Sequence, residues 1–200
     1  MNRYECLGLL APLIDSHLVV TSQSGQRIEW GSLSNHEGNL LLGEMGAALS
    51  VGAGLALALP HRRVVVLESD GSVLLSLSSL ATIANLEVPN LAVFVFDNQA
   101  YSGTRISEPT ATAGKTDLQQ VAKGAGIERS VTVRNVEDFR KEAVAAMDGE
   151  ALSFIVCKVE ESLIHRDIPR PDVDLVENKY RFVRYLQKTE GKLAPFIGRG

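Results

Sequence analysis

Hydrophobic residues follow two alternating spacings along this chain. Runs of consecutive apolar residues, rich in β-branched side chains, are typical of buried parallel strands, whereas apolar residues three or four positions apart are typical of amphipathic helices. The strand-like runs are 17–22, 63–69, 91–97, 130–133 and 153–159, and the helix-like stretches are 3–14, 43–59, 72–86, 117–123, 136–147 and 174–187. The alternation predicts an α/β fold with a doubly wound, mostly parallel sheet, helices on both faces and right-handed crossovers.

The same pattern predicts one structural unit. Residues 1–160 carry all the expected strands and form the α/β domain, and residues 161–200 form a C-terminal arm of that unit with one helix. Glycine and alanine crowd the helix-like stretch 43–59, which would allow very close packing against another element.

The composition is that of an ordinary globular protein and excludes several classes of protein. Hydrophobic residues make up 45% and charged residues 22%, close to average usage. The net charge of −4 argues against a nucleic-acid binder, which normally carries a basic stripe. No apolar run approaches the ~20 residues of a membrane span. Cys6 and Cys157 are far apart and fit neither a disulfide framework nor a zinc site. We expect a cytoplasmic protein that contacts neither membrane nor nucleic acid.

Two predicted strands end in residues that could bind a phosphate and a cation. The strand 63–69 runs into Asp70-Gly71-Ser72, and the strand 91–97 is followed by Asn98. Ligands of open parallel sheets bind beyond the carboxyl ends of the strands, and the N–H groups of a helix start suit a phosphate. Asp70 would repel that phosphate unless a cation lay between them, and carboxylate, amide and carbonyl oxygens are the ligands Mg²⁺ prefers. Either motif alone is also an ordinary turn.

Taken together, the two motifs resemble a known fingerprint. Asp70-Gly71 and, one helix and one strand later, Asn98 are similar to the Gly-Asp-Gly…Asn signature of thiamine-diphosphate enzymes. The segments GEMGAALSVGAGLALALPHRRVVVLESDGS, DNQAYSGT and PTATAGKTDLQQVAKGAGI also resemble the diphosphate-binding domain of that family. The resemblance runs from about residue 5 to residue 159. It is closest to the short (beta) subunits of sulfopyruvate and phosphonopyruvate decarboxylases, which ENKYRFVRYL near the C-terminus also resembles.

The resemblance implies a role for particular residues. Met45 would be the apolar wedge that bends the cofactor, and the Gly43 carbonyl and the Met45 N–H would hold its aminopyrimidine ring. The implied magnesium ligands are Asp70, Asn98 and the carbonyl of Ala100. The implied contacts to the rest of the cofactor are Ser22, Ser24, Gly71, Ser72 and Tyr101. His36 and Arg105 are weaker candidates for substrate contacts, since solvated or structural roles are commoner for such residues.

The chain departs from the family pattern at two positions. Ser69 stands where the fingerprint has its first glycine, and it is small enough to preserve access for a phosphate. Glu44 stands where a small neutral residue is more usual. It either adds an anion near the pyrimidine or points to solvent, and we favour solvent because glutamates at helix starts commonly interact with the helix dipole.

The function expected from the resemblance is that of the diphosphate-binding subunit of a two-component thiamine-dependent 2-oxo acid decarboxylase. Its substrate would be an anionic pyruvate derivative such as sulfopyruvate or phosphonopyruvate. The activating glutamate would come from a separate pyrimidine-binding subunit in a hetero-oligomer. The alternatives are a carboligase subunit of the acetolactate-synthase type and a non-catalytic nucleotide-binding module. The latter lacks a G-x-G-x-x-G or Walker motif.

Overall fold

The fold is built on one parallel sheet. A computed structural model describes residues 1–14, 16–23, 25–101, 107–161, 168 and 173–191. The six strands occur in the spatial order β2-β1-β3-β4-β8-β7, and every neighbouring pair is parallel. Their bounds are β1 (Leu18–Thr21), β2 (Asn39–Leu41), β3 (Val64–Ser69), β4 (Leu91–Asp97), β7 (Ser130–Val133) and β8 (Ser153–Lys158). A separate antiparallel ribbon joins β5 (Ala100–Tyr101) to β6 (Glu108–Pro109).

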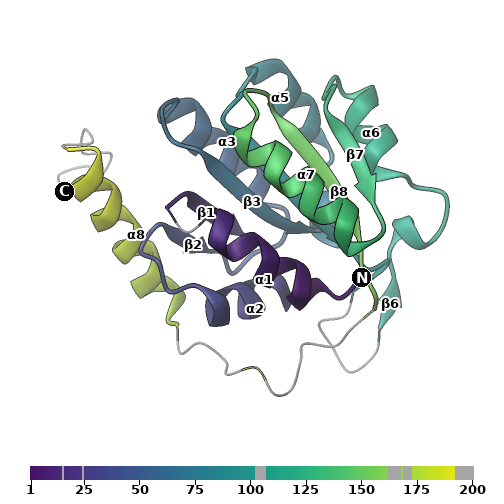
Figure 1. The fold of residues 1–200 in the computed structure, drawn as a ribbon, viewed down its shortest axis with the longest axis horizontal. Helices are drawn as coiled ribbons and strands as arrows, with labels where there is room; N and C mark the ends of the chain where they lie inside the picture. The colour runs from purple at the N-terminus through teal and green to yellow at the C-terminus, as the bar shows by residue number, and fades with distance from the viewer. Residues whose placement is uncertain (15, 24, 102–106, 162–167, 169–172, 192–200) are drawn as a thin grey trace.

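Helices cover both faces of this sheet, as the sequence predicts (Figure 1). One face packs against α1 (Arg3–Ile14), α2 (Gly25–Leu33) and α7 (Val136–Asp148). The other face packs against α3 (Ala48–Ala58), α4 (Asp70–Leu75), α5 (Ser78–Leu86) and α6 (Leu118–Gly124), where a 3₁₀ turn, η1 (Ala111–Ala113), precedes α6. Along β3, Val64 and Val66 enter the second core while Val65 and Leu67 enter the first. Burial on both faces explains the unbroken apolar runs.

The close packing expected of the glycine-rich stretch occurs at Gly52. A β-carbon at this position of α3 would collide with the side chain of Val66 on β3. The far end of the same helix is held by Asn90, whose amide donates to the carbonyls of Ala56, Leu59 and Arg62 at 2.9, 3.1 and 2.9 Å. Helix α3 therefore lies directly on the sheet strand that leads to the candidate site.

The structure corrects the predicted bounds of two helices. The helix expected over 43–59 begins only at Ala48, because Gly46 has a φ of +78° that no right-handed helix contains. The helix expected over 72–86 is two helices, α4 and α5. The break follows Ser76, whose hydroxyl hydrogen-bonds the Ser72 carbonyl at 3.5 Å. Serine hydroxyls compete in this way with the helical backbone.

Helix α2 and strand β2 were missed by the sequence prediction. Helix α2 begins at Gly25, in a stretch that its turn-forming residues made look like a loop. It is anchored by a buried ion pair, in which Arg3 Nε and Nη2 donate to the Glu29 carboxylate at 2.6 and 2.8 Å. Strand β2 has only three residues, too few for a periodic pattern. Tertiary contacts decide both elements.

The C-terminal helix α8 (Leu175–Thr189) runs along the edge strand β2 (Figure 1). Phe182 and Leu186 enter the core. The buried Asn178 accepts from the Leu41 N–H at 2.8 Å and donates to the Asn39 carbonyl at 3.0 Å. One side-chain amide thus takes the place of a further strand and satisfies the outward-facing backbone of the edge. The division at residue 160 stays a prediction, because residues 162–167 and 169–172 lie outside the described part of the chain.

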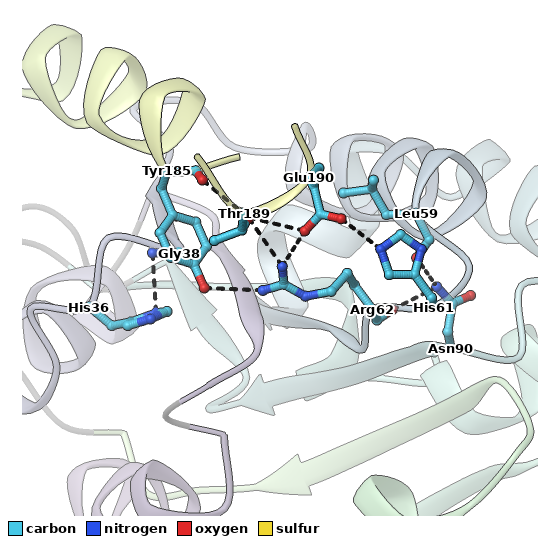
Figure 2. A network of polar contacts seen from close by, with 9 residues as sticks. All are labelled: His36, Gly38, Leu59, His61, Arg62, Asn90, Tyr185, Thr189 and Glu190. Carbon is cyan, nitrogen blue, oxygen red and sulfur yellow. Dashed lines mark hydrogen bonds and ion pairs between the residues drawn. The ribbon is translucent and has the colours of Figure 1, made fainter. Parts of the chain in front are cut away.

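The end of α8 is tied to the loop between α3 and β3 (Figure 2). Glu190 forms a hydrogen bond with His61 at 2.6 Å and an ion pair with Arg62. Arg62 also donates to the Tyr185 hydroxyl at 3.1 Å and lies over its ring. At the other end, Leu175 contacts Gly43. Helix α8 therefore runs along β2 from the carboxyl ends of the strands to their amino ends.

Within the described part of the chain, no helix is long and apolar enough to cross a membrane. A cytoplasmic location stays a prediction.

Replacing Asn178 should destabilise the protein. The Asn178→Ala variant leaves a buried N–H and a buried carbonyl without partners, which costs about 1–3 kcal/mol each when unsatisfied. We expect the free energy of unfolding, from denaturant titration, to fall by about 2 kcal/mol. Asn85→Ala is the matched control, because its exposed amide bonds only to the Ala81 carbonyl on the same helix. An unfolding curve for Asn178→Ala that matches the control would contradict this role.

The ion pairs of Glu190 should make the anchoring of α8 sensitive to acid. A hydrogen bond from His61 is the largest cause holding the pKa of Glu190 below its ordinary value of 4.5, with Thr189 and Arg62 adding to it. A lowered pKa in the folded state contributes stability that is present above 4.5 and lost as the pH falls through the folded value. Thermal unfolding measured from pH 7 to pH 3 should therefore show a steeper decline for the parent chain than for Glu190→Gln. Equal slopes would exclude the contribution.

Candidate functional site

The predicted site forms where β3 and β4 end side by side. These strands pair in register, with Ser69 opposite Phe96. Asp70 is the first residue of α4, and Asn98 directly follows β4. Both side chains are nearly inaccessible, at 0% and 8% exposure. The structure thus brings Asp70 and Asn98 together at the carboxyl ends of neighbouring strands, as the spacing of their motifs predicts.

Two threonine hydroxyls hold the carboxylate of Asp70. Oδ2 of Asp70 accepts hydrogen bonds from Thr110 Oγ1 at 2.6 Å and from Thr112 Oγ1 at 2.7 Å. Thr112 also contacts Oδ1 of Asp97 at 3.0 Å. Burial raises the pKa of Asp70, and the nearby charge of Asp97 adds to this, while the two hydroxyls oppose it. A cation bound next to Asp70 would stabilise its ionised form against this effect of burial.

Asp97 supports the turn that follows β4. Its Oδ2 is paired with the Lys158 ammonium, which lies opposite it on β8. Its Oδ1 accepts the Gln99 N–H at 3.1 Å. Gln99 has a φ of +63°, a conformation that needs such local support in a non-glycine residue. The fixed turn positions Asn98 and the Ala100 carbonyl, the two further expected ligands.

The start of α4 explains the departure at Ser69. The Ser69 hydroxyl accepts the Ser72 N–H at 3.3 Å, so it is the N-cap of the helix. A β-carbon on Gly71 would collide with the ring of Tyr101, which packs directly on this backbone and is 38% exposed. Serine at 69 is therefore compatible with the turn, whereas glycine at 71 is required by the close approach of Tyr101.

A second segment lies against the start of α4. We call residues 43–47 and residues 69–72 the two cradle segments. The Gly46 N–H donates to Ser72 Oγ at 2.8 Å, and Ser72 is fully buried. Ser72 therefore joins the two cradle segments through its hydroxyl, a role the sequence did not indicate. Met45 is half-buried, and Glu44 is exposed outside any helix, which agrees with a side chain that points to solvent.

Other expected site residues are placed differently. Ser22 is fully buried and accepts the side-chain amide of Gln26 at 2.8 Å. His36 lies before β2, near the amino ends of the strands, whereas the site lies at their carboxyl ends. Its ring stacks edge-on with that of Tyr185, with 5.0 Å between the ring centroids (Figure 2). His36 is therefore not among the residues that gather around Asp70, and a contact between His36 and a substrate stays a prediction. Ser24 and Arg105 lie outside the described residues.

Sequence reasoning missed the residues that support the site. Asp97, Thr110, Thr112 and Lys158 were not singled out. Lys158 could be connected with Asp97 only by knowing that β8 is the neighbour of β4. The pair Thr110 and Thr112, spaced by one residue, was the available signal, but polar loop residues are too common to be informative alone.

Comparisons with known proteins agree with this geometry. Residues 24–157 match the family described as "Thiamine pyrophosphate enzyme, C-terminal TPP binding domain". The chain belongs to this family. It is 32% identical over 189 residues to the sulfopyruvate decarboxylase subunit beta of Methanococcus maripaludis, covering 94% of this chain and 99% of that one. It is 35% identical over 152 residues to the corresponding subunit of Methanocaldococcus jannaschii, covering 74% and 77%.

More distant relatives are longer proteins. Phosphonopyruvate decarboxylase of Streptomyces hygroscopicus is 30% identical over 193 residues, which are 96% of this chain and 47% of that one. Among solved structures, benzoylformate decarboxylase from Polynucleobacter necessarius superposes with a TM-score of 0.67 at 17% identity, which supports the fold alone. This chain spans about a third of the solved structures it matches, 34% in that case.

The described residues fit a magnesium-bound diphosphate. In the parts of the chain that the structure describes, no group of three or more His, Cys, Asp or Glu side chains could hold a metal alone. A cation at Asp70 would depend on the Asn98 amide oxygen, the Ala100 carbonyl and oxygens of the ligand itself. Such an oxygen-only, ligand-completed set is what Mg²⁺ prefers when it binds phosphates. The individual ligand assignments remain predictions.

Replacing Asp70 should remove magnesium-dependent cofactor binding. We expect Asp70→Asn, assayed in the complete enzyme by calorimetric titration with thiamine diphosphate and Mg²⁺, to bind at least about tenfold more weakly. The amide keeps the volume but leaves the cation under-neutralised. Asp117→Asn is the control, because Asp117 is an exposed N-cap of α6 and asparagine caps equally well. Unchanged affinity in Asp70→Asn would remove Asp70 from the site.

Proposed function

We propose that this chain is the diphosphate-binding subunit of a two-component thiamine-dependent decarboxylase. Its substrate is a 2-oxo acid with a second anionic group, such as sulfopyruvate or phosphonopyruvate. The observation that carries the proposal is the meeting of Asp70 and Asn98 at adjacent strand ends, held by the hydroxyls of Thr110 and Thr112. The end-to-end match with subunits named as sulfopyruvate decarboxylase beta supports the substrate class.

Two groups of residues would hold the two ends of the cofactor. Bound thiamine diphosphate supplies the electron sink that decarboxylation of a 2-oxo acid needs. Asp70, Asn98 and the Ala100 carbonyl would hold the cation and through it the diphosphate. On the other cradle segment, the Gly43 carbonyl and the Met45 N–H would hold the aminopyrimidine ring, and the half-buried Met45 side chain would pack against the cofactor.

The names of the relatives imply a second subunit. We infer that this partner is a pyrimidine-binding subunit that carries the activating glutamate. Leu75, at the end of α4, is 63% exposed, and Tyr101 is 38% exposed, so apolar surface adjoins the cradle segments. Lys158 is committed to Asp97. The basic group for the sulfonate or phosphonate would come from the partner or from another residue of this chain, for which Arg105 is the candidate.

A carboligase is the second candidate. The chain is 28% identical to the acetolactate synthase large subunit of Pyropia yezoensis over 131 residues, 60% of this chain and 22% of that one. The same cofactor cradle serves both reactions, because they share the decarboxylation step. Product analysis separates them: a decarboxylase releases an aldehyde, whereas a carboligase releases an acyloin.

The purified chain should be inactive by itself. We expect no decarboxylation of sulfopyruvate or phosphonopyruvate by the chain with Mg²⁺ and thiamine diphosphate, and turnover once the co-purifying partner subunit is added. The reason is that the candidate site on this chain would hold the diphosphate, whereas we place the activating glutamate on the partner subunit. The complex assembled with Asp70→Asn is the negative control. Robust turnover by the isolated chain would overturn the two-component proposal.

A further inference from the structure

One hydroxyl lies between the two buried carboxylates of the candidate site. Thr112 Oγ1 is 2.7 Å from Oδ2 of Asp70 and 3.0 Å from Oδ1 of Asp97. All three residues are at most 4% exposed. Asp70 begins α4, whereas Asp97 ends β4 directly before Asn98. The Thr112 side chain therefore contacts both of the segments that carry the expected magnesium ligands.

The backbone next to Thr112 is bound to the turn that follows β4. We call residues 108–112 the threonine segment. Its Thr110 N–H donates to the Gln99 carbonyl at 3.0 Å, and β6 pairs with β5, the strand that directly follows Gln99. Thr110 Oγ1 is also 2.7 Å from Thr112 Oγ1 and 2.6 Å from Oδ2 of Asp70. The threonine segment is thus held to the turn by main-chain hydrogen bonds and to Asp70 by two hydroxyls.

Asp97 is fixed by the sheet as well as by Thr112. Its Oδ2 is paired with Lys158 of the neighbouring strand β8, and its Oδ1 accepts the Gln99 N–H at 3.1 Å. Strands β4 and β8 therefore determine where Asp97 holds Thr112, and the two threonine hydroxyls determine where Asp70 lies relative to that point. Together these contacts set the separation between Asp70 and the turn with the other two expected ligands.

A fixed separation of ligand oxygens matters more for Mg²⁺ than for a larger cation. Mg²⁺ requires a nearly regular octahedron with bonds of about 2.0–2.1 Å, whereas Ca²⁺ accepts about six to eight oxygens at about 2.3–2.6 Å in flexible arrangements. Two ligand segments that could drift apart would still bind Ca²⁺, but they would bind Mg²⁺ poorly. The rigidity of the link between the segments therefore affects which cation is preferred.

We propose that Thr112 is a positioning residue that makes the site prefer Mg²⁺ over larger cations, because its hydroxyl fixes Asp70 relative to the turn after β4. Thr112 acts through Asp70 and Asp97 and is not itself a ligand of the cation. The preference for Mg²⁺ rests on the proposed function, since it concerns the cation that binds thiamine diphosphate. The link between the two segments stands on the hydrogen bonds of Thr110 and Thr112.

The cation preference is tested by calorimetric titration of the assembled two-subunit enzyme with thiamine diphosphate, in the presence of Mg²⁺ or of Ca²⁺. Thr112→Val keeps the shape of the side chain but removes the hydroxyl. We expect it to lower the affinity measured with Mg²⁺ about tenfold or more, since residues that orient metal ligands have effects of this size. The affinity measured with Ca²⁺ should fall less than about threefold, because Ca²⁺ tolerates irregular ligand positions. An equal fall with both cations, or no fall, overturns the proposal.

Further variants separate this effect from a general loss of stability. Thr21→Val is the matched control, because Thr21 is also fully buried at the end of a strand and its hydroxyl has no hydrogen-bond partner among the described residues. Its ratio of the two affinities should equal that of the parent. Thr112→Ser keeps the hydroxyl and should keep most of the preference, and Thr112→Ala replaces Thr112→Val if that variant does not fold. A lowered ratio in Thr21→Val, or a ratio in Thr112→Ser as low as in Thr112→Val, contradicts the role of the hydroxyl.

The link between the two segments is tested without cofactor or metal, by amide hydrogen exchange on the same assembled enzyme. In Thr112→Val, exchange at Gln99 should become about threefold faster or more, because Asp97, which accepts the Gln99 N–H, loses one of its supports. Unchanged exchange at Gln99 overturns the link. A parent enzyme that binds thiamine diphosphate but does not decarboxylate contradicts the proposed function, while the titrations still decide the role of Thr112. A parent enzyme that binds thiamine diphosphate with neither cation overturns both.

Discussion

Parallel pairing of β3 with β4 is the constraint on which the site depends. The pairing places the residues that follow the two strands at one edge, so that Asp70 and Asn98 meet. Burial on both faces holds these strands, since their side chains enter two separate cores. On its other side β4 pairs with β8, which provides Lys158 for Asp97. A slip in this register would separate the candidate ligands from one another and from their supports.

Buried charges near the site are compensated in three different ways. Asp97 is neutralised by Lys158, Asp70 is held by threonine hydroxyls, and Glu68 accepts the backbone N–H of Ser69. Of these three carboxylates, only Asp97 is paired with a positively charged side chain of the protein. A bound cation at Asp70 would supply the missing charge there, which is why a metal-dependent ligand suits this edge. The positions of all three carboxylates are fixed before any ligand binds, and pre-organisation of this kind lowers the cost of binding.

Helix α8 links the carboxyl ends of the strands, where the site lies, to their amino ends. Leu175 contacts Gly43 beside the cradle, Asn178 satisfies the backbone of β2, and Glu190 is paired with His61 and Arg62 (Figure 2). Without these contacts β2 would be an unprotected edge strand, which tends to pair with other chains. The amphipathic pattern of this helix was readable in the sequence, whereas the strand that it protects was not.

The sequence by itself determined the fold class, the motif Asp70-Gly71 with Asn98, and through them the family, because these signals are local: apolar runs, turn residues and a fixed order of elements. Only the tertiary structure decided which residues support the motif. Ser72 accepts the Gly46 N–H, Thr112 contacts both Asp70 and Asp97, and His36 lies near the amino ends of the strands. Each of these contacts depends on which strands are neighbours and on how closely the helices approach the sheet. Strand order and helix packing depend in turn on side-chain packing across the whole sheet, which no local sequence pattern records.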